Sequence, residues 1–469
     1  MENETKNSRA KALREQLAYA PKNGGKTLSE EEIAASDRYC EGYKQFLNAA
    51  KTEREAVTQA VQMAEQAGFR PFTPGMALQA GDKIYVNNRG KALLLAVIGT
   101  RPITDGVTIA AAHIDSPRLD LKPNPLYEDS ELAYLDTHYY GGIKKYQWTA
   151  MPLALHGVIV RRDGTSVTVT VGEDADDPVF CVTDLLPHLG GEQMKRPAGE
   201  VVRGEDLNVL IGSRSFREDD ASEAVKLHIL QLLHEKYGIE EADFLSAELE
   251  VVPAFPARDI GFDRSMIGAY GHDDRVCAYP AVTAILECGT PAYTAVTILA
   301  DKEEIGSEGN TGMQSAFLRY FIADVAASFG AEGRHVLSHS ICLSADVNAA
   351  LDPIYPEVMV RSNAAQLNYG VCITKYTGAR GKSGSSDASA EYMGQVRRML
   401  DEQQVLWQIG ELGKVDAGGG GTVAMYIANL DVDTVDMGVP VLSMHAPYEI
   451  VAKIDVYMAH RAFLTVMQR

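Results

Sequence analysis

Short apolar runs alternate with helix-type patterns through the second half of the chain. From residue 262 onward, apolar residues recur at helical spacing over five segments, and apolar runs of strand length lie between them. Alternation of this kind predicts an α/β fold with a mostly parallel sheet and helices on both faces. The helical segments are 276–288, 313–328, 386–402, 422–430 and 453–467, and the apolar runs are 295–300, 340–345, 370–374, 405–409 and 439–444.

The first part of the chain is predicted to be helical and then β. Two Ser/Thr-x-x-Glu sequences, beginning at Ser29 and Thr52, have the spacing of a capping box, in which both residues satisfy backbone N–H groups at a helix start. They predict helices over 30–48 and 52–67. Two apolar runs follow and predict strands over 92–99 and 106–113.

The middle of the chain has a different character. Alternating apolar residues over 158–162 and 167–171 flank an Asp163-Gly164 turn, which indicates a β-hairpin. Prolines interrupt the surrounding region and leave no long helical pattern before about residue 221. The segment 119–258 is therefore predicted to be a separate β-rich unit.

The length of 469 residues predicts more than one domain, because a single core rarely grows so large. The strands predicted at 106–113 and 295–300 lie on opposite sides of the β-rich segment. The simplest topology is one α/β domain built from 1–118 and 259–469, with residues 119–258 inserted as a β-rich dimerisation or assembly domain.

Composition narrows the function classes. The chain has a formal net charge of −20, which disfavours nucleic-acid binding because phosphate neutralisation needs clustered Lys and Arg. No apolar run approaches the roughly 20 residues that cross a bilayer, and the charged segment 1–17 is no secretory signal. The six cysteines are scattered without CxxC spacing. We expect a cytoplasmic protein with no nucleic-acid or membrane partner.

Four apolar runs end in residues that can bind a metal. These residues are His113, the pair Glu303-Glu304, Asp346 and His445. Open α/β sheets bind ligands outside the carboxyl ends of their strands, and zinc takes His nitrogen and carboxylate oxygen as ligands. A metal site assembled from distant segments is therefore the first hypothesis, with a hydrolase as its function.

Further residues could complete such a site. The carboxylate of Asp273 could bridge two metals, and Asp115 could orient the imidazole of His113. Because Glu303 and Glu304 are neighbours, their side chains diverge, so that one could bind metal while the other takes a proton from water. A histidine at a strand end is more often structural, however, and these patterns leave a metal site and ordinary structural residues about equally open.

Four ordered sequences along the chain resemble the signatures of the aspartyl aminopeptidase family, which includes the vacuolar aminopeptidase I type. The resemblance covers nearly the whole chain, including the β-rich segment, and four motifs in order are far more specific than one. They are residues 112–118 (AHIDSPR), 301–307 (DKEEIGS), 344–347 (SADV) and 443–445 (SMH).

The resemblance implies a zinc-exopeptidase-like catalytic domain with two divalent metal ions per subunit. By this resemblance His113 and Asp346 would bind one metal, Glu304 and His445 the other, and Asp273 would bridge them. Zinc is the expected metal, although oxygen-rich mixed sites also suit Mn or Co.

The resemblance also assigns the catalytic roles. Glu303 would be the general base and then the acid that protonates the leaving amine, and Asp115 would orient His113. In such sites the peptide bond after the bridging aspartate is often cis, which predicts a cis bond between Asp273 and Asp274. Family members commonly carry another residue after that aspartate, so Asp274 is a departure that puts the local hydrogen bonding in question.

The substrate pocket is less well defined by the sequence. Three cations and no acid lie between residues 374 and 386, namely Lys375, Arg380 and Lys382, and Lys375 resembles a family lysine that binds acidic side chains. A solvated glycine-rich loop explains the same residues equally well. His188 resembles a residue that reaches a neighbouring subunit's site, and a structural histidine is an equal alternative.

One glycine run needs a separate explanation. Residues 418–421 are four consecutive glycines, which we expect to form a turn where backbones approach closely and not a nucleotide-binding loop.

These observations predict a metal-dependent aminopeptidase that releases N-terminal residues from peptides, acidic ones by preference and neutral ones as the alternative. The resemblance further implies a homo-oligomer, a closed tetrahedral assembly of twelve subunits. Two rival functions are a deacylase or dipeptidase with the same metals, and a non-enzymatic shell with a vestigial site. The intact set of candidate ligands argues against the vestigial site.

Overall fold

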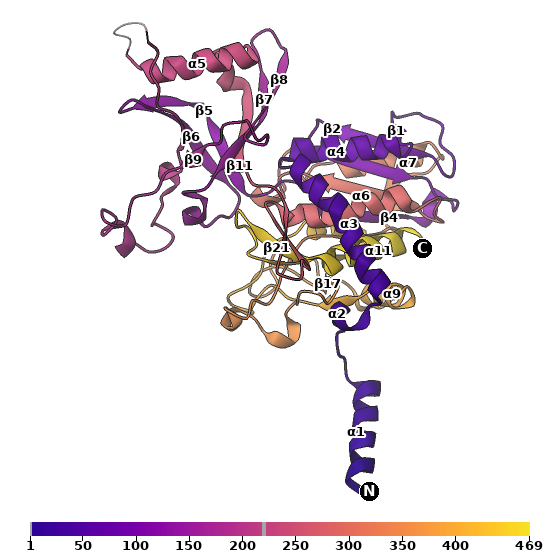
Figure 1. The fold of residues 1–469 in the computed structure, drawn as a ribbon. Coiled ribbons are helices and arrows are strands. Elements are labelled where there is room, and N and C mark those ends of the chain that lie inside the picture. The colour runs from indigo at the N-terminus through magenta and orange to yellow at the C-terminus, as the bar shows by residue number, and fades with distance from the viewer. Residues whose placement is uncertain (1, 218–221) are drawn as a thin grey trace.

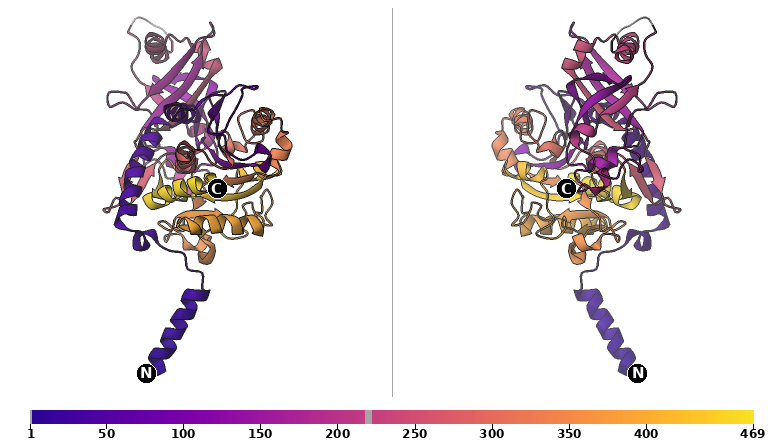
Figure 2. Two further views of the ribbon diagram at one scale, coloured as in Figure 1. Left: turned by 90° about the vertical axis from the view of Figure 1, so that its right-hand side faces the viewer. Right: turned by 90° about the vertical axis from the view of Figure 1, so that its left-hand side faces the viewer.

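The computed structural model describes residues 2–217 and 222–469 of the chain. Figure 1 shows an α/β body, a β-rich lobe at the upper left and an isolated N-terminal helix, α1 (Glu2–Leu17), which projects away from both. Figure 2 shows the same separation from two other sides. Within the described ranges, no helix is both long enough and apolar enough to cross a lipid bilayer.

The body is built on a nine-stranded sheet in the order β1-β2-β3-β14-β4-β15-β19-β17-β18. Its four central strands, β14, β4, β15 and β19, are parallel, whereas β2, β3 and β17 run antiparallel to neighbours. The sheet is therefore more mixed than the sequence predicted. The strands are β1 (Arg70–Pro71), β2 (Lys83–Asn88), β3 (Ala92–Val97), β4 (Val107–His113), β14 (Thr294–Ala300), β15 (Ile341–Ser344), β17 (Val371–Thr374), β18 (Trp407–Ile409) and β19 (Asp433–Gly438).

Helices cover both faces of this sheet, as the alternation predicted. Leu93 and Leu95 of β3 face one core and Leu94 faces the other, because successive strand residues point to opposite faces. On the first face lie α3 (Glu30–Ala49), α4 (Glu53–Gln66), α6 (His272–Glu287), α9 (Ala390–Glu402) and α11 (Lys453–Met467). On the second lie α7 (Phe317–Ala327), α8 (Gly333–Leu337) and α10 (Ala424–Ala428).

Local signals placed most of these helices well. The capping boxes at Ser29 and Thr52 are both present at the starts of α3 and α4. The segment 422–430 forms only the short helix α10, preceded by the glycine run. A further short helix, α2 (Gly24–Thr27), connects α1 to the body.

A separate five-stranded sheet corrects one prediction. The apolar run 439–444 does not continue the main sheet, because β19 ends at Gly438 and β20 pairs instead with β21 and β16. Strands β19 and β20 are both largely buried, so the sequence stays apolar on both sides of Val439 and gives no sign that the chain changes sheet there. The strands are β12 (Arg258–Ile260), β13 (Met266–Ala269), β16 (Asn348–Ala349), β20 (Pro440–Leu442) and β21 (Glu449–Ala452).

The β-rich lobe is a seven-stranded sheet in the order β8-β7-β11-β5-β6-β10-β9, antiparallel throughout its pairs, with helix α5 (Ala224–Tyr237) against it. The hairpin predicted around Gly164 is β7–β8. The lobe has its own apolar core. Its strands are β5 (Arg118–Asp129), β6 (Leu132–Tyr140), β7 (Leu153–Val160), β8 (Ser166–Val171), β9 (Cys181–Val182), β10 (Val209–Gly212) and β11 (Ala247–Pro253).

Candidate metal centre

Three neighbouring strands bring their carboxyl ends to one edge of the main sheet. His113 is the last residue of β4, and β14 and β15 pair with β4 on its two sides. Asp346 follows β15, and Glu303 and Glu304 follow β14 in a single 3₁₀ turn, η6 (Glu303–Ile305). Parallel pairing thus places four acid and imidazole side chains together, as expected for this edge of an α/β sheet.

Two further residues reach the same point from other elements. His445 follows β20 of the five-stranded sheet, and Asp273 lies in the first turn of α6. The prediction that all four apolar runs end at one sheet edge is therefore correct for three of them. The fourth reaches the site from the second sheet.

Asp273 lies between the two histidines. His113 Nε2 is 3.1 Å from Asp273 Oδ1, and His445 Nε2 is 3.2 Å from Asp273 Oδ2. His113 Nε2 is also 3.8 Å from Asp346 Oδ1, and His445 Nε2 is 3.6 Å from Glu304 Oε1. Each histidine therefore faces one oxygen of the shared carboxylate and a second carboxylate of its own.

Several of these atoms are buried with their lone pairs unused. His113 Nε2, Asp273 Oδ1 and Glu304 Oε1 find no hydrogen-bond partner in the part of the chain that the structure describes. Buried polar atoms are rarely left so. The six side chains also form three overlapping groups whose ligand atoms lie within 4.8 Å of one another. Nitrogen and carboxylate oxygen converging in this way fit divalent metal ions of the zinc type.

The far nitrogens of both histidines are held by backbone carbonyls. His113 Nδ1 lies 3.0 Å from the carbonyl oxygen of Asp115, and His445 Nδ1 lies 2.8 Å from that of Gly142. A carbonyl only accepts, so each Nδ1 donates its hydrogen, and Nε2 is the nitrogen that faces the cluster and could bind a metal after losing its proton. The tautomer that binds a metal is thus fixed from behind.

The carboxylate of Asp115 supports more than His113. Its Oδ1 is 3.3 Å from His113 Nδ1 and accepts the backbone N–H of Glu303 at 3.1 Å. Its Oδ2 accepts the backbone N–H of Glu304 at 3.1 Å and the hydroxyl of Tyr140 at 2.9 Å. Asp115 therefore ties the end of β4 to the turn that carries both glutamates.

Sequence reasoning missed two residues that support the centre. Glu449, at the start of β21, accepts the backbone N–H of Asp273 at 3.0 Å and that of His445 at 2.7 Å. Tyr140 was missed as well. The only local signal for Glu449 is an acid at the start of a buried strand, which is too common to be specific.

The peptide bond between Asp273 and Asp274 is cis, as predicted. The departure at Asp274 has a structural consequence, since its buried carboxylate accepts the backbone N–H of His113 at 3.3 Å.

The clustered carboxylates shift the pKa values of the site. Burial and the neighbouring Asp346 raise the pKa of Glu303 to about 8. Burial disfavours charge on His445, but the hydrogen bond and charge of Asp273 outweigh it and raise the pKa of His445 to about 11. The pKa of His113 is raised in the same way against its burial, by Asp115, Asp273 and Asp346. Metal binding at these ligands must therefore release protons.

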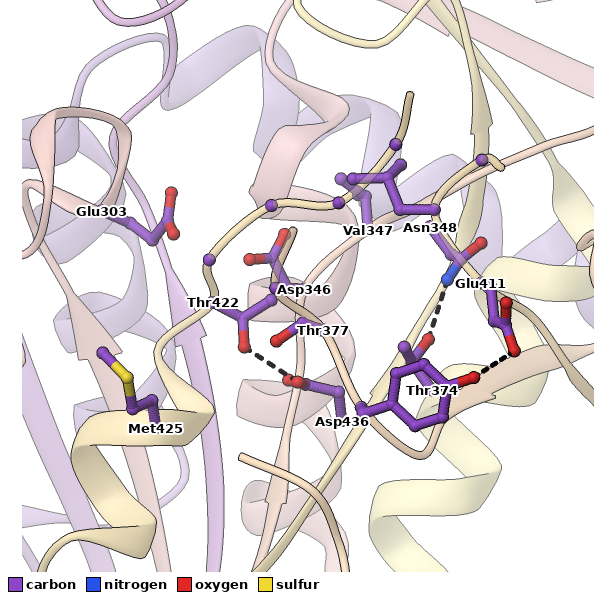
Figure 3. Close-up of a pocket in the computed structure, with 18 of the residues that line it drawn as sticks. Glu303, Asp346, Val347, Asn348, Thr374, Thr377, Glu411, Thr422, Met425 and Asp436 are labelled. Carbon is purple, nitrogen blue, oxygen red and sulfur yellow. Dashed lines mark hydrogen bonds between the residues drawn. The ribbon is translucent and has the colours of Figure 1, made fainter. Parts of the chain in front are cut away.

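A cavity of about 560 Å³ opens beside the cluster (Figure 3). Glu303, Asp346 and the glycine-rich loops around 376–382 and 411–422 line it, and Thr377 and Thr422 of these loops lie next to Asp346. The expected close approach at the glycine run is confirmed, because a Cβ on Gly419 would lie 2.1 Å from the carbonyl oxygen of Gly378. A volume of this size accommodates a small ligand or the end of a peptide.

The predicted substrate-binding residues do not all reach this cavity. Arg380 and Lys382 line it, whereas Lys375 is not among the described residues that do. Lys375 instead forms an ion pair with Asp387, which also pairs with Lys382 at 2.9 Å. Asp387 lies just beyond the segment that the sequence showed to be free of acids, so the local excess of positive charge is smaller than expected. His188 is exposed in the β-rich lobe, outside the lining of this cavity as far as the chain is described.

A buried acid that the sequence did not single out lines the cavity. Asp436 of β19 accepts a hydrogen bond from Thr422 at 2.8 Å (Figure 3). Burial and the nearby Asp346 raise the pKa of Asp436 to about 7.

Comparison with known proteins gives consistent matches. The family model described as aminopeptidase I zinc metalloprotease (M18) matches residues 46–466. A probable M18 family aminopeptidase 1 of Clostridium acetobutylicum is 52% identical over 91% of this chain and 93% of its own. The crystal structure of an M18-family aminopeptidase from Thermotoga maritima has a TM-score of 0.92 at 43% identity, covering 96% of this chain and 99% of that one. The aminopeptidase I structure from Clostridium acetobutylicum has a TM-score of 0.91 at 50% identity, covering 97% and 100%.

A more distant likeness concerns the fold alone. The structure described as the S. cerevisiae mApe1 dodecamer has a TM-score of 0.74 at 18% identity, and covers 93% of this chain and 97% of that one.

Proposed function

The chain belongs to the aminopeptidase I zinc metalloprotease family (M18) and is therefore a peptidase, and we propose that it removes N-terminal residues with the help of two divalent metal ions. The observation that carries this proposal is the set of buried, unpartnered ligand atoms around Asp273 within the described residues. His113 and Asp346 would hold one metal, Glu304 and His445 the other, and the two oxygens of Asp273 would bridge them. Zinc fits this ligand set, and manganese or cobalt would also suit it.

Bound at these ligands, the metals would make a water molecule nucleophilic near neutral pH. Glu303 is the residue placed to move protons. Its Oε2 lies 3.9 Å from His113 Nε2, at the edge of the ligand cluster and on the cavity side. Its raised pKa suits a group that accepts a proton from water and then donates it to the leaving amine. Asp115 orients Glu303 through the backbone N–H that it accepts.

Acidic N-terminal residues are the proposed preference, and neutral ones are the alternative. Arg380 and Lys382 give the cavity positive charge that could hold a substrate carboxylate. Against this, Asp387 offsets Lys382 and Lys375, and the buried Asp436 adds an acid to the wall. These acids favour neutral substrate side chains, and the two preferences are distinguished by the substrates below.

The central test compares Asp-, Glu- and Leu-aminoacyl substrates on the metal-loaded protein and on Glu303→Gln. We expect Glu303→Gln to keep both metals, because Glu303 is not needed as a ligand, and to lose a factor of about 10²–10⁴ in kcat. Glu304→Gln should instead lose metal, and the exposed Glu308→Gln should behave as the parent protein. Full activity in Glu303→Gln would refute the mechanism, whereas a strong preference for Leu would refute only the acidic specificity.

The cations can be tested separately. If Arg380 binds the substrate carboxylate, Arg380→Ala raises KM for Asp and Glu substrates and leaves Leu substrates unchanged. Lys375→Ala is the comparison, since Lys375 pairs with Asp387 and is not among the described residues that line the cavity. An effect seen only in Lys375→Ala would show that Lys375, as the sequence predicted, binds the substrate carboxylate.

The rival functions can be distinguished by the substrates that the protein accepts. N-acetylated and free-amine peptides tried side by side distinguish a deacylase from an aminopeptidase, because an aminopeptidase needs the free amine. Inactivity of the metal-loaded protein on every such substrate would support a vestigial site.

We also propose a homo-oligomer, a tetrahedral dodecamer, located in the cytoplasm. The fold likeness to a dodecameric protein supports the assembly. The exposed His188 is then free to approach a neighbouring subunit. The six cysteines are all unpaired with one another, which suits a reducing compartment.

A further inference from the structure

Three consecutive residues of the β-rich lobe contact the residues of the candidate metal centre. Tyr140 ends strand β6, and Gly141 and Gly142 continue from it. Each of the three contacts a different part of the centre, although β6 belongs to a sheet whose strands are separate from those that carry the ligands.

Tyr140 is fixed on both sides. Its hydroxyl donates to Asp115 Oδ2 at 2.9 Å, and the Arg118 guanidinium lies over its ring at 3.9 Å. Arg118 is held in turn by Asp120, at 2.7 Å, and Glu250, at 3.2 Å. These contacts hold the tyrosine ring in the position where its hydroxyl reaches Asp115, and the cation–π contact with Arg118 adds to that stabilisation.

Gly141 packs against the ligand Glu304. A Cβ at this position would lie 3.2 Å from Glu304 Oε2 and 3.3 Å from Glu304 Cβ, and the backbone has φ +75°, which favours glycine. The absence of a side chain therefore leaves the space that Glu304 occupies.

Gly142 acts on the other ligand. Its carbonyl oxygen accepts Nδ1 of His445 at 2.8 Å, and a Cβ would lie 3.3 Å from the same nitrogen. A methyl group there would crowd the imidazole and push it from its present position.

We infer that the segment Tyr140-Gly141-Gly142 is a positioning element of the metal centre. The inference rests on the proposed two-metal function. Tyr140 orders Asp115, and through it the backbone of Glu303 and Glu304. Gly142 orients His445. The β-rich lobe thus holds one ligand directly and two site glutamates indirectly, in addition to any part that it has in assembly.

The first test is Tyr140→Phe, which removes the hydroxyl and keeps the ring over Arg118. Asp115 Oδ2 would lose one of its two donors, and the turn bearing both glutamates would be less firmly held. Residues that support ligands in this way typically contribute 10–100-fold to metal affinity or activity. We expect kcat to fall by roughly 10–100-fold with KM little changed, and metal to be lost to a chelator at lower concentration.

Tyr139→Phe is the matched control, since Tyr139 neighbours Tyr140 on the same strand and its hydroxyl bonds to no described residue. It should match the parent protein in kcat, KM and chelator resistance. Equal thermal unfolding of both variants would show that the fold is intact. If Tyr140→Phe equals Tyr139→Phe in kcat and in chelator resistance, the inference is wrong.

Gly142→Ala tests the other contact. We expect it to bind one metal as the parent does and the second, at His445, more weakly, measured as metal ions per subunit during chelator titration. Gly199→Ala, in the same lobe, has no described atom within 4 Å of its Cβ position and is the control. Two equally retained metals in Gly142→Ala would overturn the role of Gly142. A parent protein that binds no metal and cleaves no peptide would instead refute the proposed function itself.

Discussion

At the scale of single residues, the candidate metal centre depends on acceptors that fix backbone N–H groups around the proposed ligands. The buried carboxyl groups of Asp115, Asp274 and Glu449 each accept a backbone N–H from a residue that we propose to bind metal or to catalyse. A carboxyl group has two oxygens and can accept two such bonds. The backbone positions of the proposed ligands are therefore fixed without a metal.

Glu449→Gln tests this arrangement. Glutamine keeps the shape but replaces one accepting oxygen by an NH₂ group, which cannot accept the N–H of Asp273 or of His445. We expect metal affinity to fall by roughly 10–100-fold in a protein that still folds, measured by chelator competition. Glu402→Gln, on an exposed position at the end of α9, should show no change. Unaltered metal affinity in Glu449→Gln would contradict the role given to Glu449.

At the scale of elements, the α/β body and the β-rich lobe meet along partly buried polar contacts. His156 of β7 lies between Glu55 of α4, 2.7 Å away, and Glu173, 3.0 Å away, and Lys51 also pairs with Glu173 at 2.6 Å. Burial disfavours charge on His156, but the two carboxylates outweigh it and raise the pKa of His156 to about 8 from an ordinary 6.5. The protonated imidazole thus joins the two parts.

This contact predicts a dependence of stability on pH. Because the pKa is raised on folding, the stabilisation is fully present below pH 6.5 and is lost as the pH rises through about 8. It is worth about 2 kcal/mol, from a rise of roughly 1.5 pKa units. His156→Gln should therefore be less stable than the parent at pH 6, with the difference shrinking by pH 9, measured by denaturant unfolding. A difference that stays constant over this range would show that His156 is not charged in the folded protein.

At the scale of the whole molecule, the β-rich lobe exposes large apolar side chains. Leu189 is 70% exposed and Met194 is 74% exposed, on one irregular segment of the lobe. Exposed apolar groups gathered in this way are typical of interaction surfaces. The segment also carries His188, which fits the proposed assembly in which one subunit approaches the site of another.

Replacing both apolar residues tests this interface. The double variant Leu189→Glu, Met194→Glu should shift the mass in solution from the oligomer to smaller species, because burying two carboxylates in an interface is strongly unfavourable. Light scattering after gel filtration measures the mass. Leu17→Glu, at an exposed position on the projecting helix α1, is the control. An unchanged mass in the double variant would place the interface elsewhere.

Features that depend on neighbouring residues along the chain could be predicted from the sequence. Caps at Ser29 and Thr52, the alternation of helix and strand, and the candidate ligands at the ends of apolar runs are local patterns that can be read one segment at a time. The candidate ligands could be predicted because β14, β4 and β15 are buried strands with polar residues at or just past their ends.

The contacts between distant segments could not be predicted in this way. Three findings follow from three-dimensional packing. The chain changes sheet after Gly438, and Lys375 pairs with Asp387. The candidate centre is supported by Tyr140, Gly142 and Glu449. Strand order and side-chain contacts between residues hundreds of positions apart leave no periodic trace in the chain. They are set by the burial and hydrogen bonding of the whole fold.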